Sequence, residues 1–110
     1  MRIAVSTYDG RTVCGELGKC NRFMIFDADN HGILRRGMRF FPGPARQNLL
    51  QDCQAVITQG MGRGMYDGLM SAGIIPVLTL EEDPEAAVRQ FLSGGVAENC
   101  QENWYSAQDN

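Results

Sequence analysis

Residues 54–79 read QAVITQGMGRGMYDGLMSAGIIPVLT, and this stretch decides the fold class. Two short apolar runs, 54–59 and 74–79, flank a segment at 62–72 whose spacing predicts a helix that ends at Gly73. A strand, a helix and a second strand in this order are typical of the crossover between parallel strands. The stretch therefore predicts an α/β protein.

The residues before this stretch predict three strands that include a hairpin. Runs rich in β-branched and aromatic residues lie at 2–8, 22–28 and 33–41. The tetrapeptide at 29–32, DNHG, is typical of a tight hairpin turn, and we interpret its histidine, His31, as a turn residue. Within the third predicted strand, Gly37 indicates a bulge.

Two further helices complete the predicted order βββαβαβα. One begins near Pro44 and runs to about Cys53, and the other spans residues 83–93 with Asp83 as its N-cap. Right-handed crossovers then predict a five-stranded mixed sheet with helices on its faces. Pro76 indicates that the last strand lies at an edge of this sheet.

We expect one α/β domain at residues 1–95 and a polar, acidic tail at residues 96–110, because the chain has 110 residues, of which 44% are hydrophobic. No run approaches the roughly 18 apolar residues of a membrane span, and the N-terminus lacks the long apolar region of a secretory signal. We therefore expect a cytoplasmic protein without membrane attachment, as a monomer or weak dimer. Its four cysteines are then expected to be reduced thiols.

The charge distribution favours a small anion as ligand. The net charge is −3, yet nine of the ten basic residues precede residue 81, and seven of the thirteen acidic residues follow residue 80. The bases are nearly all arginine, whose planar guanidinium suits anions of fixed geometry. They are too few for a nucleic-acid-binding face, so we expect no nucleic-acid partner.

The turn within residues 58–68, TQGMGRGMYDG, is the candidate binding site. It fits neither the Walker loop nor the dinucleotide fingerprint, but glycines at the start of a helix leave backbone N–H groups directed outward at an anion. Thioethers suit soft partners, and at the tip of a turn they are poorly placed for the core. The predicted cofactor-binding residues of the turn are Gly60, Met61, Gly62, Arg63, Gly64 and Met65. The alternative is that these glycines only allow a tight turn and close packing.

Three segments of the sequence resemble the dinitrogenase iron–molybdenum cofactor biosynthesis family, which comprises small domains of ribonuclease-H-like fold that bind or carry metal–sulfur clusters. They are the first strand at 1–6 (MRIAVS), the loop and strand at 13–27 (VCGELGKCNRFMIFD), and the glycine turn at 56–62 (VITQGMG) with the strand after it. The resemblance covers roughly residues 1–95. It departs at residues 16–18, where ELG replaces the family's common His-Phe-Gly and removes a histidine that could touch a metal.

The resemblance implies a non-catalytic carrier or scaffold for an anionic metal–sulfur cluster, either iron–sulfur or molybdenum-containing, with a cluster donor or acceptor protein as its partner. Cys14 and Cys20 would be the metal ligands, with Lys19 and Arg22 nearby to favour the thiolate. Because the first and fourth predicted strands are parallel neighbours, their following loops should converge. We therefore expect the cysteine loop and the glycine turn to form one electropositive groove.

Three other functions were weighed against this one. The first is a regulatory or interaction module of the same fold that no longer binds a cluster. A metal-dependent nuclease would need several carboxylates on the central strands, and Asp9 and Asp27 are too few. A thiol-redox role for Cys14 and Cys20 is disfavoured, because the five residues between them do not match a redox motif.

Overall fold

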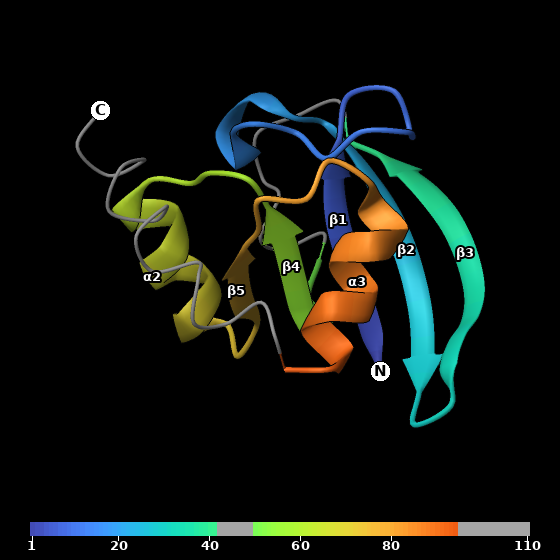
Figure 1. The fold of residues 1–110 in the computed structure, drawn as a ribbon. Coiled ribbons are helices and arrows are strands. Elements are labelled where there is room, and N and C mark those ends of the chain that lie inside the picture. Colours follow the sequence, from blue (N-terminus) through green and yellow to red (C-terminus); the bar gives the residue numbers. More distant parts are fainter. Residues whose placement is uncertain (42–49, 95–110) are drawn as a thin grey trace.

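The computed structural model of the protein describes residues 1–41 and 50–94, and its centre is one five-stranded sheet (Figure 1). The strand order is β3-β2-β1-β4-β5. Strand β2 pairs antiparallel with β1 and β3, whereas β4 pairs parallel with β1 and β5. The strands are β1 (Arg2–Thr7), β2 (Arg22–Asp29), β3 (Gly32–Phe40), β4 (Ala55–Thr58) and β5 (Ile75–Leu78). The predicted five-stranded mixed sheet of an α/β protein is confirmed.

The predicted hairpin joins β2 to β3. Asp29 pairs with Gly32, and the N–H of His31 donates to Oδ1 of Asp29 at 2.7 Å, so the aspartate side chain holds the turn. Gly32 has a φ of 127°, a backbone conformation that favours glycine. His31 is therefore a turn residue, as predicted.

The predicted bulge at Gly37 is wrong, because this residue pairs in register with Ile25. The register shifts elsewhere, between Asp27 and Ala28, whose partners are Arg35 and Ile33. The extra residue lies between those two partners, and its backbone has no positive φ. A bulge of this kind places no demand on residue type, so a glycine did not mark it.

Within the described residues two α-helices pack on the sheet, and their bounds agree with the prediction to within about a residue. Helix α2 (Arg63–Ser71) packs against β5, and α3 (Pro84–Leu92) packs against β1 and lies in front of the sheet in Figure 1. Asp83 caps α3, since its Oδ2 accepts from the N–H of Ala86 at 3.3 Å. Of the helix predicted from Pro44 to about Cys53, residues 42–49 fall outside the described residues, and 50–52 form a turn.

The core fills the space between the sheet and its covering segments. Ile3 and Val5 of β1, Phe23 and Phe26 of β2, and Ile57 of β4 are all fully buried. Strand β5, which contains Pro76, is an edge strand, as predicted. Within the described residues no helix is both long and apolar enough to cross a membrane. The predicted tail at residues 96–110 lies outside the part of the chain that the structure describes.

Candidate functional site

The loops that leave β1, β4 and β5 gather at one end of the sheet, at the top of Figure 1. We name residues 8–20, 59–64 and 79–83 together the carboxyl edge. The N–H of Leu17 donates to the carbonyl of Gly60 at 2.8 Å, and the N–H of Gln59 donates to the carbonyl of Cys14 at 3.1 Å. The cysteine loop and the glycine turn therefore meet, as the parallel pairing of β1 with β4 requires.

Buried hydroxyl groups fix these loops to the strands, and the sequence interpretation did not identify them. The Ser6 hydroxyl donates to Thr58 Oγ1 at 2.8 Å, and Thr58 Oγ1 lies 3.2 Å from the carbonyl oxygen of Cys14 and 3.3 Å from that of Gly60. Buried polar groups need such partners, so these contacts hold the loops in place. The available signal was a hydroxyl residue at or just after the end of each parallel strand, at Thr7, Thr58 and Thr79.

Cys14 and Cys20 are joined by a disulfide, with their Cα atoms 6.6 Å apart. The expectation of reduced thiols is therefore wrong for this pair. The spacing argument against a paired role fails too, because the 3₁₀ turn η1 (Leu17–Lys19) folds the loop back and brings both cysteines together. Cys14 is 0% exposed and Cys20 is 1% exposed. In this form the pair offers no thiolate to a metal.

Met61 lies in the core, where its exposure is 0%. The expectation that the methionines of this turn are poorly placed for the core is therefore wrong. The hydrogen bond from Leu17 to Gly60 holds the turn against the cysteine loop, and the side chains of Leu17 and Met61 both enter the hydrophobic cluster. Met65 is partly buried and packs against the same cluster. Of the predicted site residues, these two are accounted for by packing.

The start of α2 is the open part of the carboxyl edge. Gly62, Arg63 and Gly64 are exposed, and a Cβ atom added at either glycine would meet no neighbour within 4 Å among residues 1–41 and 50–94. Gly62 is the N-cap with φ −76°, it offers no side-chain acceptor to the helix, and the first turn contains no acidic residue. Neither backbone conformation nor packing requires glycine here. The positive end of the helix therefore has no side chain of Gly62 or Gly64 in front of it.

The other two predicted cations are engaged by neighbours. The Nζ of Lys19 lies 3.4 Å from Oε2 of Glu16, an exposed pair of small energetic weight. Nη1 of Arg22 donates to the carbonyl of Tyr8 at 3.4 Å, and its guanidinium carbon lies 5.8 Å from the centre of the Phe40 ring. Arg22 is thus held towards β3. This position does not support its predicted role, which was to favour a thiolate at the cysteines.

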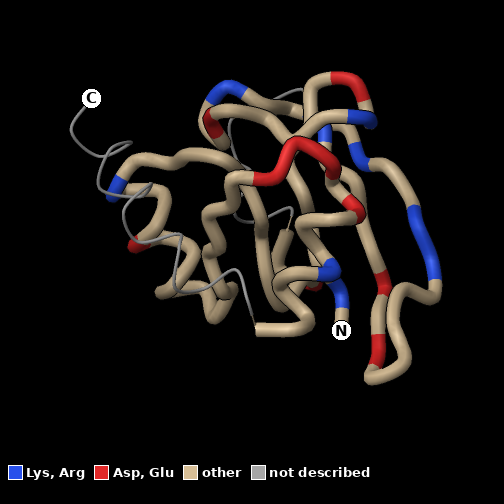
Figure 2. Tube along the Cα trace, in the orientation of Figure 1, with Lys and Arg blue, Asp and Glu red and all other residues tan. Residues whose placement is uncertain are grey.

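Acidic residues lie on the carboxyl edge together with basic ones, as Figure 2 shows at the top of the molecule. Residues 81–83, EED, follow the end of β5. The carbonyl of Glu82 accepts from the N–H of Val13 at 2.7 Å, and that of Glu81 accepts from Nε2 of Gln59 at 3.0 Å. The edge therefore carries both signs of charge, where the sequence interpretation expected a positive lining.

The side chains that could bind a metal are scattered over the described residues. In residues 1–41 and 50–94, no three His, Cys, Asp or Glu side chains are grouped to hold a metal ion. The two carboxylates weighed for a nuclease lie at opposite ends of β1. Asp9 follows that strand, whereas Asp27 accepts from Nε of Arg2, the first residue of β1, at 2.7 Å. They do not form a shared metal site.

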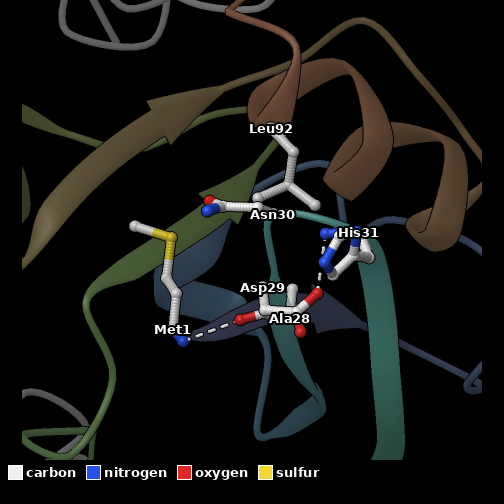
Figure 3. A pocket seen from close by; sticks show the side chains of 6 residues that line it. All are labelled: Met1, Ala28, Asp29, Asn30, His31 and Leu92. Atoms are coloured by element: carbon white, nitrogen blue, oxygen red, sulfur yellow. Dashed lines mark hydrogen bonds between the residues drawn. The ribbon is translucent and has the colours of Figure 1, made fainter.

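A hollow of about 350 Å³ lies at the opposite end of the sheet, beside the β2–β3 hairpin. It is lined by Met1, Ala28, Asp29, Asn30, His31 and Leu92 (Figure 3). Figure 3 shows the amino group of Met1 donating to the carbonyl of Ala28, at 2.8 Å, beside the Asp29–His31 turn contact. The hollow is built from the N-terminus, the end of β2, the hairpin turn and the last residue of α3, and it shares no residue with the carboxyl edge.

Known proteins support the fold and the family. Residues 1–94 match the family described as dinitrogenase iron-molybdenum cofactor. A comparison with curated proteins found no match. The crystal structure of PH0822 is 22% identical with a TM-score of 0.77, covering 86% of this chain and 92% of that one.

Two further solved structures are similar. The protein mj0327 from Methanocaldococcus jannaschii is 16% identical with a TM-score of 0.74, covering 87% of this chain and 91% of that one. The apo form of the orange protein from Desulfovibrio gigas is 23% identical with a TM-score of 0.71, covering 86% of this chain and 89% of that one. At these identities the likeness shows the fold. The family match spans the whole described domain and every loop of the carboxyl edge, and the chain belongs to the dinitrogenase iron-molybdenum cofactor family.

Proposed function

We propose that this protein binds an anionic metal–sulfur cluster at the carboxyl edge and carries it between proteins of cofactor assembly. The cluster, iron–sulfur or molybdenum-containing, is cargo, and no reaction is assigned to the chain. Membership of the dinitrogenase iron-molybdenum cofactor family supports a role in handling such a cofactor. The partners in this proposal are a cluster donor and a cluster acceptor.

The observation that carries the proposal is the open start of α2. Gly62 and Gly64 are exposed glycines that neither φ nor packing against the described residues requires, and they place no side chain of their own over the first-turn amides. Backbone amides at a helix start bind anions through their N–H groups and the helix dipole. Arg63, the first helical residue, adds a full positive charge at the same place. Exposed Lys19, on the neighbouring cysteine loop, is a further cation of the edge.

A substitution at Gly64 tests the proposal because stability and binding should respond in opposite directions. Gly64→Glu replaces a helical glycine and places an acid in the first turn, which together should stabilise the fold by about 1 kcal/mol. The same carboxylate would repel an anionic cluster. We expect anaerobic reconstitution with iron and sulfide, or with thiomolybdate and copper, to give a coloured wild-type protein and a much paler Gly64→Glu variant.

Two controls isolate the charge effect. Gly64→Gln has nearly the same shape without the charge, and it should retain more colour than Gly64→Glu. Gly37→Glu adds the same acid at an exposed glycine of β3 that also has open surroundings, and it should leave uptake unchanged. If wild-type protein takes up neither probe, or if Gly64→Glu is as coloured as Gly37→Glu, the cluster site at α2 is excluded.

A regulatory or interaction module that binds no cluster is the second candidate. The observation in its favour is the acidic run at residues 81–83, which lies on the same edge and would oppose an anion. Such a surface would instead suit a basic partner. Protein purified without oxygen from its native source distinguishes the two functions. A coloured protein that contains iron or molybdenum supports the carrier, whereas a colourless protein bound to a partner supports the module.

A further inference from the structure

The disulfide lies at the joint between two loops of the carboxyl edge. Between its cysteines, Leu17 donates its N–H to the carbonyl of Gly60, and the carbonyl of Cys14 accepts from Gln59. The Leu17 side chain is 1% exposed. A change in the separation of Cys14 and Cys20 therefore acts directly on the segment that leads into α2.

Reduction must move the sulfur atoms of Cys14 and Cys20 apart. Sulfur atoms in a disulfide are about 2 Å apart, whereas non-bonded heavy atoms need about 3.5–4 Å. Cys14 and Cys20 are both buried, so two thiols do not fit in the space that one disulfide occupies without a shift of the loop. The residues between them include Gly15, Glu16, Gly18 and Lys19, which are all exposed. The loop can therefore move outward into solvent.

We propose that Cys14 and Cys20 form a redox switch of the carboxyl edge, closed as a disulfide and opened by reduction to a pair of thiol ligands. The biological purpose of this switch rests on the proposed cluster-binding function, but the reduction of the disulfide does not depend on any cluster. In the closed state both sulfur atoms are bonded to each other and covered, so a cluster contacts only amides and charge. In the open state the same edge adds two thiolates, which are ligands for soft metals.

The reaction is a thiol–disulfide exchange with a dithiol, either a small molecule or a protein. A thiolate of the dithiol attacks one sulfur, the Cys14–Cys20 bond breaks, and the second thiol of the reductant displaces the remaining cysteine. Two electrons and two protons pass to the pair, and the dithiol leaves as a disulfide. Attack requires local opening, because the sulfurs are buried in the closed loop. The Cys14 sulfur lies 3.2 Å from the Glu16 carbonyl oxygen, which can accept its new S–H.

Cys53 does not compete in this exchange. It is buried and unpaired in the part of the chain that the structure describes. Burial raises the pKa of its thiol to about 11, and neighbouring Asp52 adds to the effect, so the thiolate is scarce at neutral pH. Among the cysteines of the described residues, exchange should therefore stay within the Cys14–Cys20 pair.

The first test follows the switch without any cargo. Protein equilibrated with oxidised glutathione, then unfolded and alkylated, should carry two fewer alkyl and glutathionyl groups in total than protein treated with a dithiol, and peptide mapping should link Cys14 to Cys20. Reduction should speed hydrogen exchange at the Leu17 amide about tenfold, since its hydrogen bond to Gly60 is loosened. Full alkylation after oxidation, or unchanged exchange at Leu17 after reduction, would overturn the switch.

The second test uses cadmium ions alone, because a soft metal reports thiolates through an ultraviolet charge-transfer band. Reduced wild-type protein, freed of reductant without oxygen, should bind cadmium at least about tenfold more tightly than the disulfide form. The variant Cys14→Ser/Cys20→Ser, reduced in the same way, gives the background from the other cysteines. Equal binding by reduced wild type and this variant rejects the pair as ligands, whatever the result of cluster reconstitution. Conversely, cadmium binding without cluster uptake leaves the switch standing and removes the proposed cargo.

Discussion

Asp52 connects three parts of the chain through one carboxylate. Its Oδ1 accepts from Nη1 of Arg39 on β3 at 2.7 Å, and its Oδ2 accepts from Nη1 of Arg2 on β1 at 2.7 Å. Arg2 also donates through Nε to Asp27 of β2. The hydrogen bonds from Arg39, and next those from Arg2, hold the pKa of Asp52 well below its usual range, although partial burial opposes them.

This network predicts an acid-dependent stability. A carboxylate with a depressed folded pKa stabilises the fold above its unfolded pKa of about 3.9, and the contribution is lost as pH falls through the folded value. Asp52→Asn should therefore lower the urea midpoint at about pH 7 and have progressively less effect below about pH 4. Chemical denaturation at several pH values measures this difference. A gap between variant and wild type that stays constant down to about pH 2 would contradict the assignment.

Substitutions at Met61 distinguish a packing role of its side chain from a role as a cluster ligand. Because the side chain is fully buried, Met61→Ala should lower the free energy of unfolding by roughly 2–5 kcal/mol, whereas Met61→Leu should cost less than about 1.5 kcal/mol. Denaturant titration of both variants gives these values. Met61→Leu should also keep full cluster uptake in reconstitution. Loss of colour in a stably folded Met61→Leu variant would restore the thioether as a ligand.

The role of Met61 illustrates how far residue types alone can be interpreted. A methionine among glycines suggested an exposed turn, but its burial depends on a hydrogen bond between Leu17 and Gly60, which are distant in the chain. The pairing of Cys14 with Cys20 likewise depends on a 3₁₀ turn that has no hydrophobic period. By contrast, the meeting of their loop with the glycine turn was predictable, because it follows from the order of the strands.

At the scale of elements, α3 depends on its first residues. Asp83 accepts from the N–H of Ala86, Pro84 fills the first helical position, and Glu85 pairs with Arg36 of β3 and Arg89 of α3. The hydrogen bond from Arg36, followed by that from Arg89, holds the pKa of Glu85 below its usual value. The helix is thus fixed to the hairpin half of the sheet as well as to β1.

Removing the cap should destabilise this helix without disturbing the sheet. Asp83→Ala should lower the free energy of unfolding by about 1 kcal/mol, within the usual range of about 0.5–2 kcal/mol. Glu82→Ala, at the exposed neighbouring position, is the matched control and should have little effect. Thermal unfolding followed by circular dichroism compares the two. Equal losses in both variants would indicate a general charge effect at residues 81–83 in place of capping.

Local signals predicted α3 and the hairpin because capping and turn chemistry act within a few residues. The misplaced bulge shows their limit. Gly37 was a local signal, but the register shift near Ala28 depends on how two whole strands align. The fold class was accessible from the sequence because apolar periods and crossover handedness operate over complete elements.

At the scale of the whole molecule, three parallel strands end at one edge, so chemistry from distant parts of the chain collects there. Residues 8–20 and 59–62 were placed correctly from strand order. The charge of the edge was not predicted correctly, because the loop after β5 brings residues 81–83 to the same end and contacts Val13 through Glu82. The sequence shows where the acidic residues lie along the chain, but only the assembled fold shows which loops lie beside them.

The Cys14–Cys20 bond should also contribute to the stability of the whole domain. Closing a loop of seven residues removes unfolded-state entropy worth about 2 kcal/mol at 25 °C in the chain-entropy treatment. We therefore expect a dithiol to lower the Tm of wild-type protein by roughly 8 °C for a domain of this size.

Cys53→Ala should show the same response, because Cys53 is a free thiol. Cys14→Ser/Cys20→Ser should instead have one low Tm with or without reductant. If complete reduction leaves the wild-type Tm unchanged, the loop is held by its hydrogen bonds and by Leu17 alone, and the covalent link contributes nothing to the stability of the fold.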